Sequence, residues 1–169
     1  MDALDALSTR RSIRRHTVAP VSDALIAALL RAAMSAPSAG NQQPWQFVVI
    51  RDRQLREAIS TFHPFADMVR KAPAAVLVCG DLERERYPGY WVQDCAAATE
   101  NLLLAAHASG LGAVWVGVYP KEDRVARFQQ LLGLPSRVIP LALVPLGWPD
   151  ERLPAVDRFD PGRVHQNLW

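Results

Sequence analysis

The chain has 169 residues, of which 50% are hydrophobic and 21% charged, so its length and composition are those of an ordinary globular protein, and we expect one domain spanning residues 1–169. The formal net charge of +2 is too small to indicate a nucleic-acid partner. No apolar run approaches the roughly 18 residues of a membrane span, and the first residues show no signal-peptide pattern. We therefore expect a cytoplasmic protein without a membrane partner.

A dense basic cluster follows the first predicted element. Leu4 and Leu7 indicate a short helix that leads into Arg10-Arg11-Ser12-Ile13-Arg14-Arg15. Arginine forks match phosphate oxygens bidentately, and the hydroxyl of Ser12 adds a neutral donor. A solvated basic patch is the simpler interpretation. The polar loop described next favours an anion site.

That polar loop, Pro37 to Trp45, separates a helix from a strand. The helix is predicted to begin after Ser22 as N-cap and to end near Ser35, before Pro37. The strand covers Phe47 to Ile50. The loop combines turn-forming residues with several hydrogen-bonding side chains. It is consistent with a capped turn that anchors Trp45 in the core, or with a small polar cradle for a flat ligand, which we favour.

The middle of the chain predicts a helix, a loop and a buried strand. Apolar positions from Leu55 to Phe62 indicate the helix. The segment Phe62 to Met68 is compatible with a mobile aromatic loop over a pocket and with a packed connection. The continuous apolar run Ala74 to Cys79 is typical of a strand buried on both faces.

The longest predicted helix runs from about Trp91 to Ser109 and is apolar on nearly all sides. Such a helix must be covered by a core or by another subunit. A strand, Ala113 to Tyr119, follows and carries Gly117 near its end. Glycine in a strand marks either close approach by a ligand or a bulge.

The last third of the chain predicts two further elements and a tail. Glu122 to Leu132 is a helix stopped by Gly133, and Ile139 to Leu146 is a strand interrupted by two prolines. The residues after Pro149 show no periodicity. We expect them to form an extended arm over residues 149–169.

No familiar catalytic pattern is present. The chain lacks a Ser-His-Asp set, a Walker loop, a metal-ligand spacing and a Gly-x-Gly-x-x-Gly turn. A reaction without an evident acid, base or nucleophile is usually carried by a cofactor. An anion site, a polar cradle and apolar walls suit a phosphorylated planar cofactor.

The chain resembles the nitroreductase family of flavin enzymes over nearly its whole length. Four segments carry the resemblance and occur in the family's order. Each is weak alone, and their ordered combination is specific. They are Arg10–Arg14, Ala36–Phe47, Asn101–Ala106 with Gly110–Trp115, and Leu146–Pro149 followed by a tail ending in His165–Trp169.

The resemblance implies an α+β fold, a three-layer α-β-α sandwich with a central mixed sheet, whose C-terminal arm is exchanged in a homodimer. It also implies FMN as cofactor and NADH or NADPH as reductant. The electron acceptor would be an electron-poor small molecule such as a nitroaromatic, quinone or enone, reduced in alternating half-reactions. No side chain needs to act as a proton donor.

The resemblance also assigns the basic residues. Arg10, Ser12 and Arg14 match the family's contacts to the phosphate and ribityl chain of FMN. Arg11 occupies the same motif, at the pyrimidine side of the flavin. Arg158 matches the family's tail cation on the phosphate.

The remaining assignments come from two other segments. Pro37, Ser38 and Asn41 match the loop that meets the flavin from the second subunit. Gly117 and Val118 match positions whose backbone lies beside the reactive nitrogen of the ring. All catalytic chemistry is then carried by the flavin.

The chain departs from the family in two respects. Longer members carry an Asn and a Lys before the second strand, and the segment Phe65 to Lys71 has no clear counterpart. The chain also lacks the insertions that build substrate lids in some members. Two alternatives therefore stay open: other flavin chemistry, such as reductive dehalogenation or flavin destruction, and a non-enzymatic flavin-binding protein.

Overall fold

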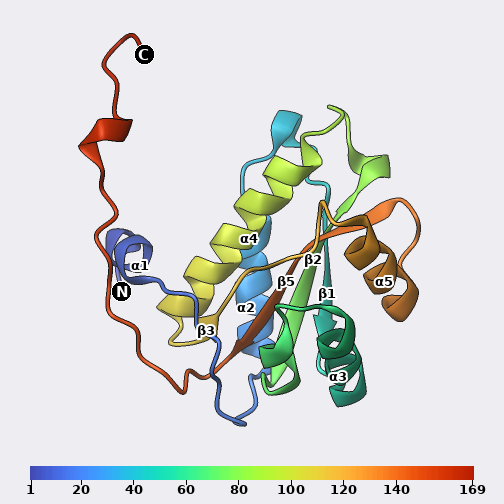
Figure 1. Ribbon diagram of the computed structural model, residues 1–169. Coiled ribbons are helices and arrows are strands. Elements are labelled where there is room, and N and C mark those ends of the chain that lie inside the picture. The colour runs from blue at the N-terminus through green and yellow to red at the C-terminus, as the bar shows by residue number, and fades with distance from the viewer.

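The computed structural model describes all residues from Met1 to Trp169 (Figure 1). The predicted helices and strands are present, with one of the strands divided in two. In chain order they are α1 (Ala3–Thr9), α2 (Asp23–Met34), β1 (Trp45–Ile50), α3 (Arg53–Phe62), β2 (Ala74–Asp81), α4 (Trp91–Ala108), β3 (Gly112–Ala113), β4 (Val116–Gly117), α5 (Glu122–Leu132) and β5 (Val138–Gly147). Short 3₁₀ turns lie at Ala39–Asn41, Asp67–Arg70, Leu82–Arg84 and Pro161–Arg163.

The elements form three layers. The sheet has the order β1-β2-β5-β3, with β4 also paired to β5. Helices α2 and α4 cover one face, and α3 and α5 cover the other (Figure 1). Every residue of β2 is buried, as its continuous apolar run predicts. The predicted α+β sandwich is confirmed.

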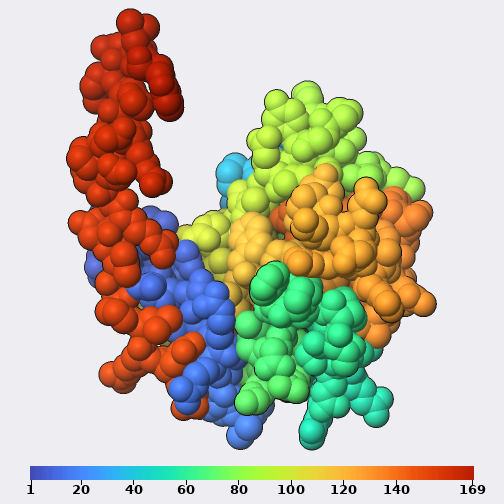
Figure 2. All heavy atoms as spheres, in the orientation of Figure 1, coloured from blue at the N-terminus to red at the C-terminus, as the bar shows by residue number.

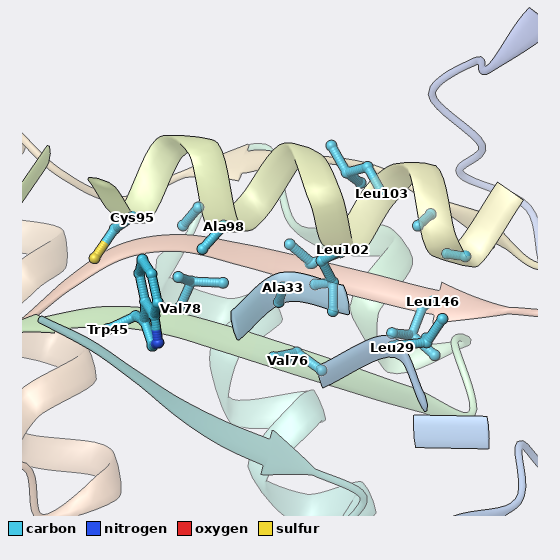
Figure 3. Close-up of a cluster of buried hydrophobic side chains, with 14 of the residues drawn as sticks. Leu29, Ala33, Trp45, Val76, Val78, Cys95, Ala98, Leu102, Leu103 and Leu146 are labelled. Carbon is cyan, nitrogen blue, oxygen red and sulfur yellow. The ribbon is translucent and has the colours of Figure 1, made fainter. Parts of the chain in front are cut away.

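Alternation along β2 supplies both cores. Val76 and Val78 pack toward α2 and α4, whereas Leu77 packs toward α3 and α5. Figure 3 shows the first core, in which Leu29 of α2 and Leu102 of α4 meet the sheet. Because the central strands are buried on both faces, the functional groups are confined to the sheet edges and the helix ends.

All pairings between the named strands are antiparallel. The parallel pairing of a mixed sheet is present only as an isolated bridge between Ser12 and Ala113. The N-terminal segment pairs with β3 only through this bridge and does not form a strand beside it.

The predicted strand Ala113 to Tyr119 is divided into β3 and β4, although both pair with β5 in one continuous register. The break lies opposite Pro145. The Val114 N–H donates to the Pro145 carbonyl at 3.4 Å. Proline has no N–H to return to the Val114 carbonyl, so the ladder is incomplete at this pair.

After β5 the chain runs along the N-terminal segment and then projects away from the body (Figure 2). This tail has one 3₁₀ turn and no strand, and its Phe159 and Trp169 side chains are exposed. None of the helices in the structure combines the length and the apolarity needed to cross a membrane.

Candidate functional site

The basic segment Arg10–Arg15 is held between α4 and the open edge of the sheet. Arg10 Nε donates to Glu100 of α4 at 3.1 Å. The Ile13 N–H donates to the Ala113 carbonyl of β3 at 3.0 Å. The segment is therefore fixed at both ends against regular elements.

The first part of the tail folds back onto the same segment. The Glu151 carboxylate accepts from the N–H groups of Arg14 and Arg15 at 2.6 and 3.0 Å. These bonds, led by the one from Arg14, hold the pKa of Glu151 below its usual value. Arg11 also donates to the carbonyl of Pro154. The tail is thereby placed so that Arg158 lies beside the N-terminal arginines.

Three guanidinium groups line a single cavity, which we call the arginine cavity. Arg10, Arg11 and Arg158 outnumber its one carboxylate, Asp157. Clustered guanidiniums of this kind bind phosphate groups by charge-assisted, bidentate hydrogen bonds. The cavity measures about 470 Å³ and is lined by Leu7, Ser8, Arg10, Arg11, Ala155, Val156, Asp157 and Arg158.

Arg14 lies in a second cavity, the edge cavity, on the open side of β3 and β4. It faces Trp115 and Gly117 across a hollow of about 470 Å³. Figure 2 shows the N-terminal, 64–68 and 114–117 segments side by side at this place. The lining residues are Arg14, Pro64, Phe65, Asp67, Met68, Val114, Trp115, Val116 and Gly117.

The backbone of Gly117 faces away from the sheet. The Val118 N–H donates to the Leu141 carbonyl at 3.0 Å. Hydrogen-bonded and non-hydrogen-bonded pairs alternate in an antiparallel ladder, so Gly117, opposite Ala142, directs its N–H and C=O outward. A Cβ at Gly117 would meet no atom within 4 Å. The pairing is regular at Gly117 itself, but a bulge follows it, because the N–H groups of Val118 and Tyr119 both donate to the Leu141 carbonyl, at 3.0 and 3.1 Å. The predicted bulge is therefore present beside Gly117, and the space in front of Gly117 is open to a ligand.

Two side chains hold the Gly117 carbonyl. His63 Nε2 lies 2.9 Å from this oxygen, and Arg124 donates to it at 3.1 Å. The Phe65 N–H donates to His63 Nδ1 at 3.3 Å, which assigns the proton to Nε2 and makes the ring neutral. Burial lowers the pKa of His63 and so favours this neutral form. The orientation of the Gly117 peptide is thus fixed from outside the sheet.

The segment Phe62 to Met68 is a packed connection with one exposed aromatic side chain. His63 and Ala66 are buried, whereas Phe65 is 68% exposed at the rim of the edge cavity. The Arg124 guanidinium lies 5.5 Å from the centre of the Phe65 ring, in cation–π geometry. The segment is therefore the predicted packed connection, and it carries an aromatic side chain at the rim of a cavity.

The polar loop Pro37 to Trp45 is fixed at the beginning of α4. The buried Asp94 carboxylate accepts from the Ala39 N–H at 2.9 Å and from Gln42 Nε2 at 2.6 Å. Gln42 Oε1 in turn accepts from the Arg86 N–H at 2.8 Å. The loop is therefore rigid, and the side chain of Trp45 is buried in the core as well.

Within one chain this loop does not meet the arginines. Pro37 and Asn41 are exposed and Ser38 is half-buried, and none of them lines either cavity. The loop is anchored on Asp94, and the N-terminal segment is anchored near His107 through Thr9 at 2.8 Å. His107 lies 13 positions beyond Asp94, which is about 20 Å along the helix axis, and Glu100, the partner of Arg10, lies 6 positions beyond Asp94, which is about 9 Å.

The structure groups the predicted site residues in three places. Arg10, Arg11 and Arg158 share the arginine cavity, whereas Arg14 and Gly117 share the edge cavity. Ser12 bridges Ala113 between the two cavities, and Val118 is buried with its N–H engaged in the ladder. The loop residues Pro37, Ser38 and Asn41 form the third group.

Three residues with a role at these places were not predicted: His63, Asp94 and Arg124. His63 and Asp94 act on groups more than 50 residues away, and Arg124 acts on a carbonyl seven residues before it, in another element. No local sequence pattern marks any of these contacts. The structure contains no group of histidine, cysteine and acidic residues that could hold a metal ion.

The fold and the two cavities define an α+β protein with a cationic site beside an open sheet edge. The sequence model of the nitroreductase family matches residues 7–64 and 63–148. The chain therefore belongs to the nitroreductase family.

Individual relatives agree in sequence and in fold. A protein of Methanothermobacter thermautotrophicus, provisionally named NADH dehydrogenase/NAD(P)H nitroreductase, is 50% identical over 169 residues, covering 100% of this chain and 88% of the relative. A Bacteroides thetaiotaomicron structure with the same provisional name has a TM-score of 0.95 at 39% identity and covers 99% of this chain and 98% of its own. A provisionally named nitroreductase of Desulfovibrio desulfuricans, solved in complex with FMN, has a TM-score of 0.86 at 32% identity over 100% of this chain and 99% of its own.

The buried histidines predict that acid weakens the fold. Burial lowers the pKa of both His63 and His16 below the ordinary value of 6.5. Below about pH 6.5 the unfolded chain therefore binds protons that the folded chain excludes. As the pH is lowered, the free energy of unfolding should decrease by at most about 1.4 kcal/mol per pH unit for each histidine. Urea unfolding between about pH 7.5 and pH 5 measures this slope.

The substitution His63→Gln isolates the contribution of His63 to the pH dependence of stability, because glutamine retains an N–H donor for the Gly117 carbonyl and does not titrate. Its stability should depend less steeply on pH over the same range. His165→Gln, in the exposed tail, is the matched control and should keep the wild-type slope. An unchanged slope in His63→Gln would show that His63 is not held neutral in the fold.

Proposed function

We propose that the chain is an FMN-dependent oxidoreductase that takes reducing equivalents from NADH or NADPH and reduces an electron-poor small molecule such as a nitroaromatic, quinone or enone. One observation carries the proposal. A cavity with three guanidiniums and an open sheet edge with an outward N–H lie along the same short N-terminal segment. The FMN complex of the Desulfovibrio relative and the names of the other relatives support this assignment.

The residues present fit a phosphorylated flavin. Arg10, Arg11 and Arg158 would hold the phosphate, and the half-buried Ser12 adds a neutral donor beside them. FMN, when bound, accepts hydride from the nicotinamide and passes electrons to the acceptor in alternating half-reactions, with protons from solvent. The arginine cavity orients this cofactor by its phosphate.

The edge cavity would hold the ring. The outward Gly117 N–H is a donor without a side chain in its way, and Arg14 adds a positive charge to the same cavity. Donors fixed in this way stabilise negative charge on a reduced ring without reorganisation. His63 and Arg124 keep the donor in place by holding the carbonyl of the same residue.

This assignment exchanges two roles implied by the resemblance. Arg11 is assigned to the phosphate of FMN because it lines the arginine cavity, and Arg14 is assigned to the flavin ring because it lines the edge cavity. The Val118 N–H is engaged with Leu141, so Gly117 is the donor of the pair.

We further propose that the active form is a homodimer. The loop with Pro37, Ser38 and Asn41 lines neither cavity of its own chain, and would complete the site of the partner. Apolar side chains that a partner would cover are exposed on α1 and on the tail. They are Leu4 at 76%, Leu7 at 56%, Phe159 at 76%, Leu168 at 82% and Trp169 at 102%.

Anaerobic mixing tests the reaction. Heat-released cofactor should be FMN, and NADH or NADPH should bleach the bound flavin rapidly in stopped flow. Colour should return when a quinone or nitroaromatic is added. Release of FAD, or flavin that neither nicotinamide bleaches, would contradict the proposal and favour the alternative flavin chemistry or a binding protein without turnover.

Arg158→Ala tests the phosphate assignment. Loss of one charge-assisted hydrogen bond to phosphate should weaken FMN binding by about tenfold or more. Flavin fluorescence titration of the apoprotein measures the affinity. The control is Arg163→Ala, in the same tail, where the side chain pairs with Asp160 at 3.1 Å and lines neither cavity. Equal affinities for the two variants would remove Arg158 from the site.

A chain that stops after Arg158 tests the dimer. It retains the tail contacts of Glu151 and Pro154 but lacks the exposed apolar side chains of Phe159, Val164, Leu168 and Trp169. Each of these four contributes about 1.5 to 3 kcal/mol when buried, before ordering costs. Light scattering should show a weaker dimer, with FMN lost on dilution as the subunits separate. A monomer that keeps FMN fully bound would contradict the shared site.

Subunit complementation sharpens this test. A chain with Arg158→Ala and a chain with Asn41→Ala each impair one half of the proposed site. A mixed dimer would contain one site built from two wild-type halves. Flavin binding should therefore increase when the two variants are unfolded and refolded together, and should stay low when each is refolded alone.

A further inference from the structure

A third cavity, which we call the basic hollow, lies between the N-terminal segment, α3 and the chain before β2. Figure 2 shows these three segments side by side at the lower edge of the molecule. The hollow measures about 410 Å³, and four of its lining residues are cations while none is a carboxylate. The lining residues are His16, Val18, Arg53, Arg56, Arg70, Lys71, Ala72 and Pro73.

Arg56 is a buried cation without a counterion. It is 9% exposed, and no carboxylate lies within ion-pair distance of its guanidinium. One terminal nitrogen donates to the carbonyls of Val69, Arg70 and Ala72, and Nε has no partner. Burial and the nearby charge of Arg53 lower the pKa of Arg56. The three carbonyls satisfy part of the guanidinium but carry no full charge, so a bound anion would supply the missing counterion.

His16 adds two more unsatisfied polar atoms. Its side chain is 9% exposed, and neither ring nitrogen has a hydrogen-bond partner of good geometry, although the Gly147 backbone and the charge of Glu151 act weakly on the ring. Buried nitrogens of this kind are normally satisfied. Arg56 and His16 belong to different segments of the chain, so the lack of hydrogen-bond acceptors and of a counterion is a property of the hollow and not of one residue.

The remaining cations are only partly neutralised. Arg53 pairs with Glu57 at 2.7 Å and Arg70 pairs with Asp67 at 2.6 Å, but neither carboxylate lines the hollow. Lys71 is exposed and has no ion pair. Asp52 and Glu57 are the acidic groups that act on Arg56 from its own helix, and both are exposed.

We propose that the basic hollow binds a phosphate group. A phosphate would supply the counterion that Arg56 lacks and acceptors for Arg53, Arg70 and Lys71. The hollow adjoins the edge cavity, because residues 14 and 16 and residues 67–68 and 70–71 line the two in succession. The 2′-phosphate of a nicotinamide nucleotide is therefore the favoured source. That choice of source rests on the proposed function, and the phosphate site itself does not.

Calorimetric titration of the purified protein with inorganic phosphate, 2′-AMP and adenosine tests the proposal. Arg53→Gln combined with Lys71→Gln changes two exposed cations of the hollow and should weaken phosphate and 2′-AMP binding by about tenfold or more. Lys121→Gln combined with Arg127→Gln makes the same change of charge on and beside α5, away from the hollow, and should leave binding unchanged. Thermal unfolding of both variants checks that each is folded.

The pattern of binding identifies the source of the phosphate. Tighter binding of 2′-AMP than of inorganic phosphate supports a nucleotide, and equal affinities support a free-phosphate site. No binding of either anion, or an equal loss in both variants, would overturn the proposal. These titrations follow no flavin signal, so a failure of FMN binding or turnover would be seen separately.

Discussion

The alternation of hydrogen bonds along residues 112–118 determines which backbone groups of the sheet edge are free to hold the N-terminal segment and a ligand. Residues 114 and 118 donate to β5, so the backbone groups of residues 113, 115 and 117 face outward. The carbonyl of Ala113 then receives the N-terminal segment, and the carbonyl of Gly117 receives His63 and Arg124. A shift of one residue would bury these groups and leave the arginines without a surface to lie on.

The layers were predictable from the sequence because local signals agree with the tertiary structure. Ser22 caps α2, Gly133 takes the left-handed conformation after α5, and the apolar run before Cys79 forms the buried strand β2. The break between β3 and β4 was not predictable. It depends on Pro145, which is distant in sequence and only becomes opposite Val114 once the register is known.

The sequence was sufficient to predict which residue types form the candidate site, but not how the fold distributes them between the cavities. In the sequence the arginines form one cluster. In the structure the backbone of this segment is fixed by hydrogen bonds that Arg14 donates to Glu151 and Ile13 donates to Ala113, and Arg14 and Arg11 line different cavities. Asp94 and His63 carry no local signal, because each binds a segment more than 50 residues away. Buried polar groups of this kind are recognised by the groups that they satisfy, which only the folded chain brings together.

An open strand edge is also a hazard, since unpaired backbone groups invite another strand to add. Here the N-terminal segment covers one end of the β3–β4 edge, and His63 with Arg124 covers the other. Only the outward groups of Trp115 and the N–H of Gly117 remain between them. That interval is too short to nucleate a ladder with a second chain, yet it leaves a donor for a small planar molecule. The N-terminal segment and the His63–Arg124 pair therefore shield this edge of the sheet from another strand and still leave part of it open to ligands.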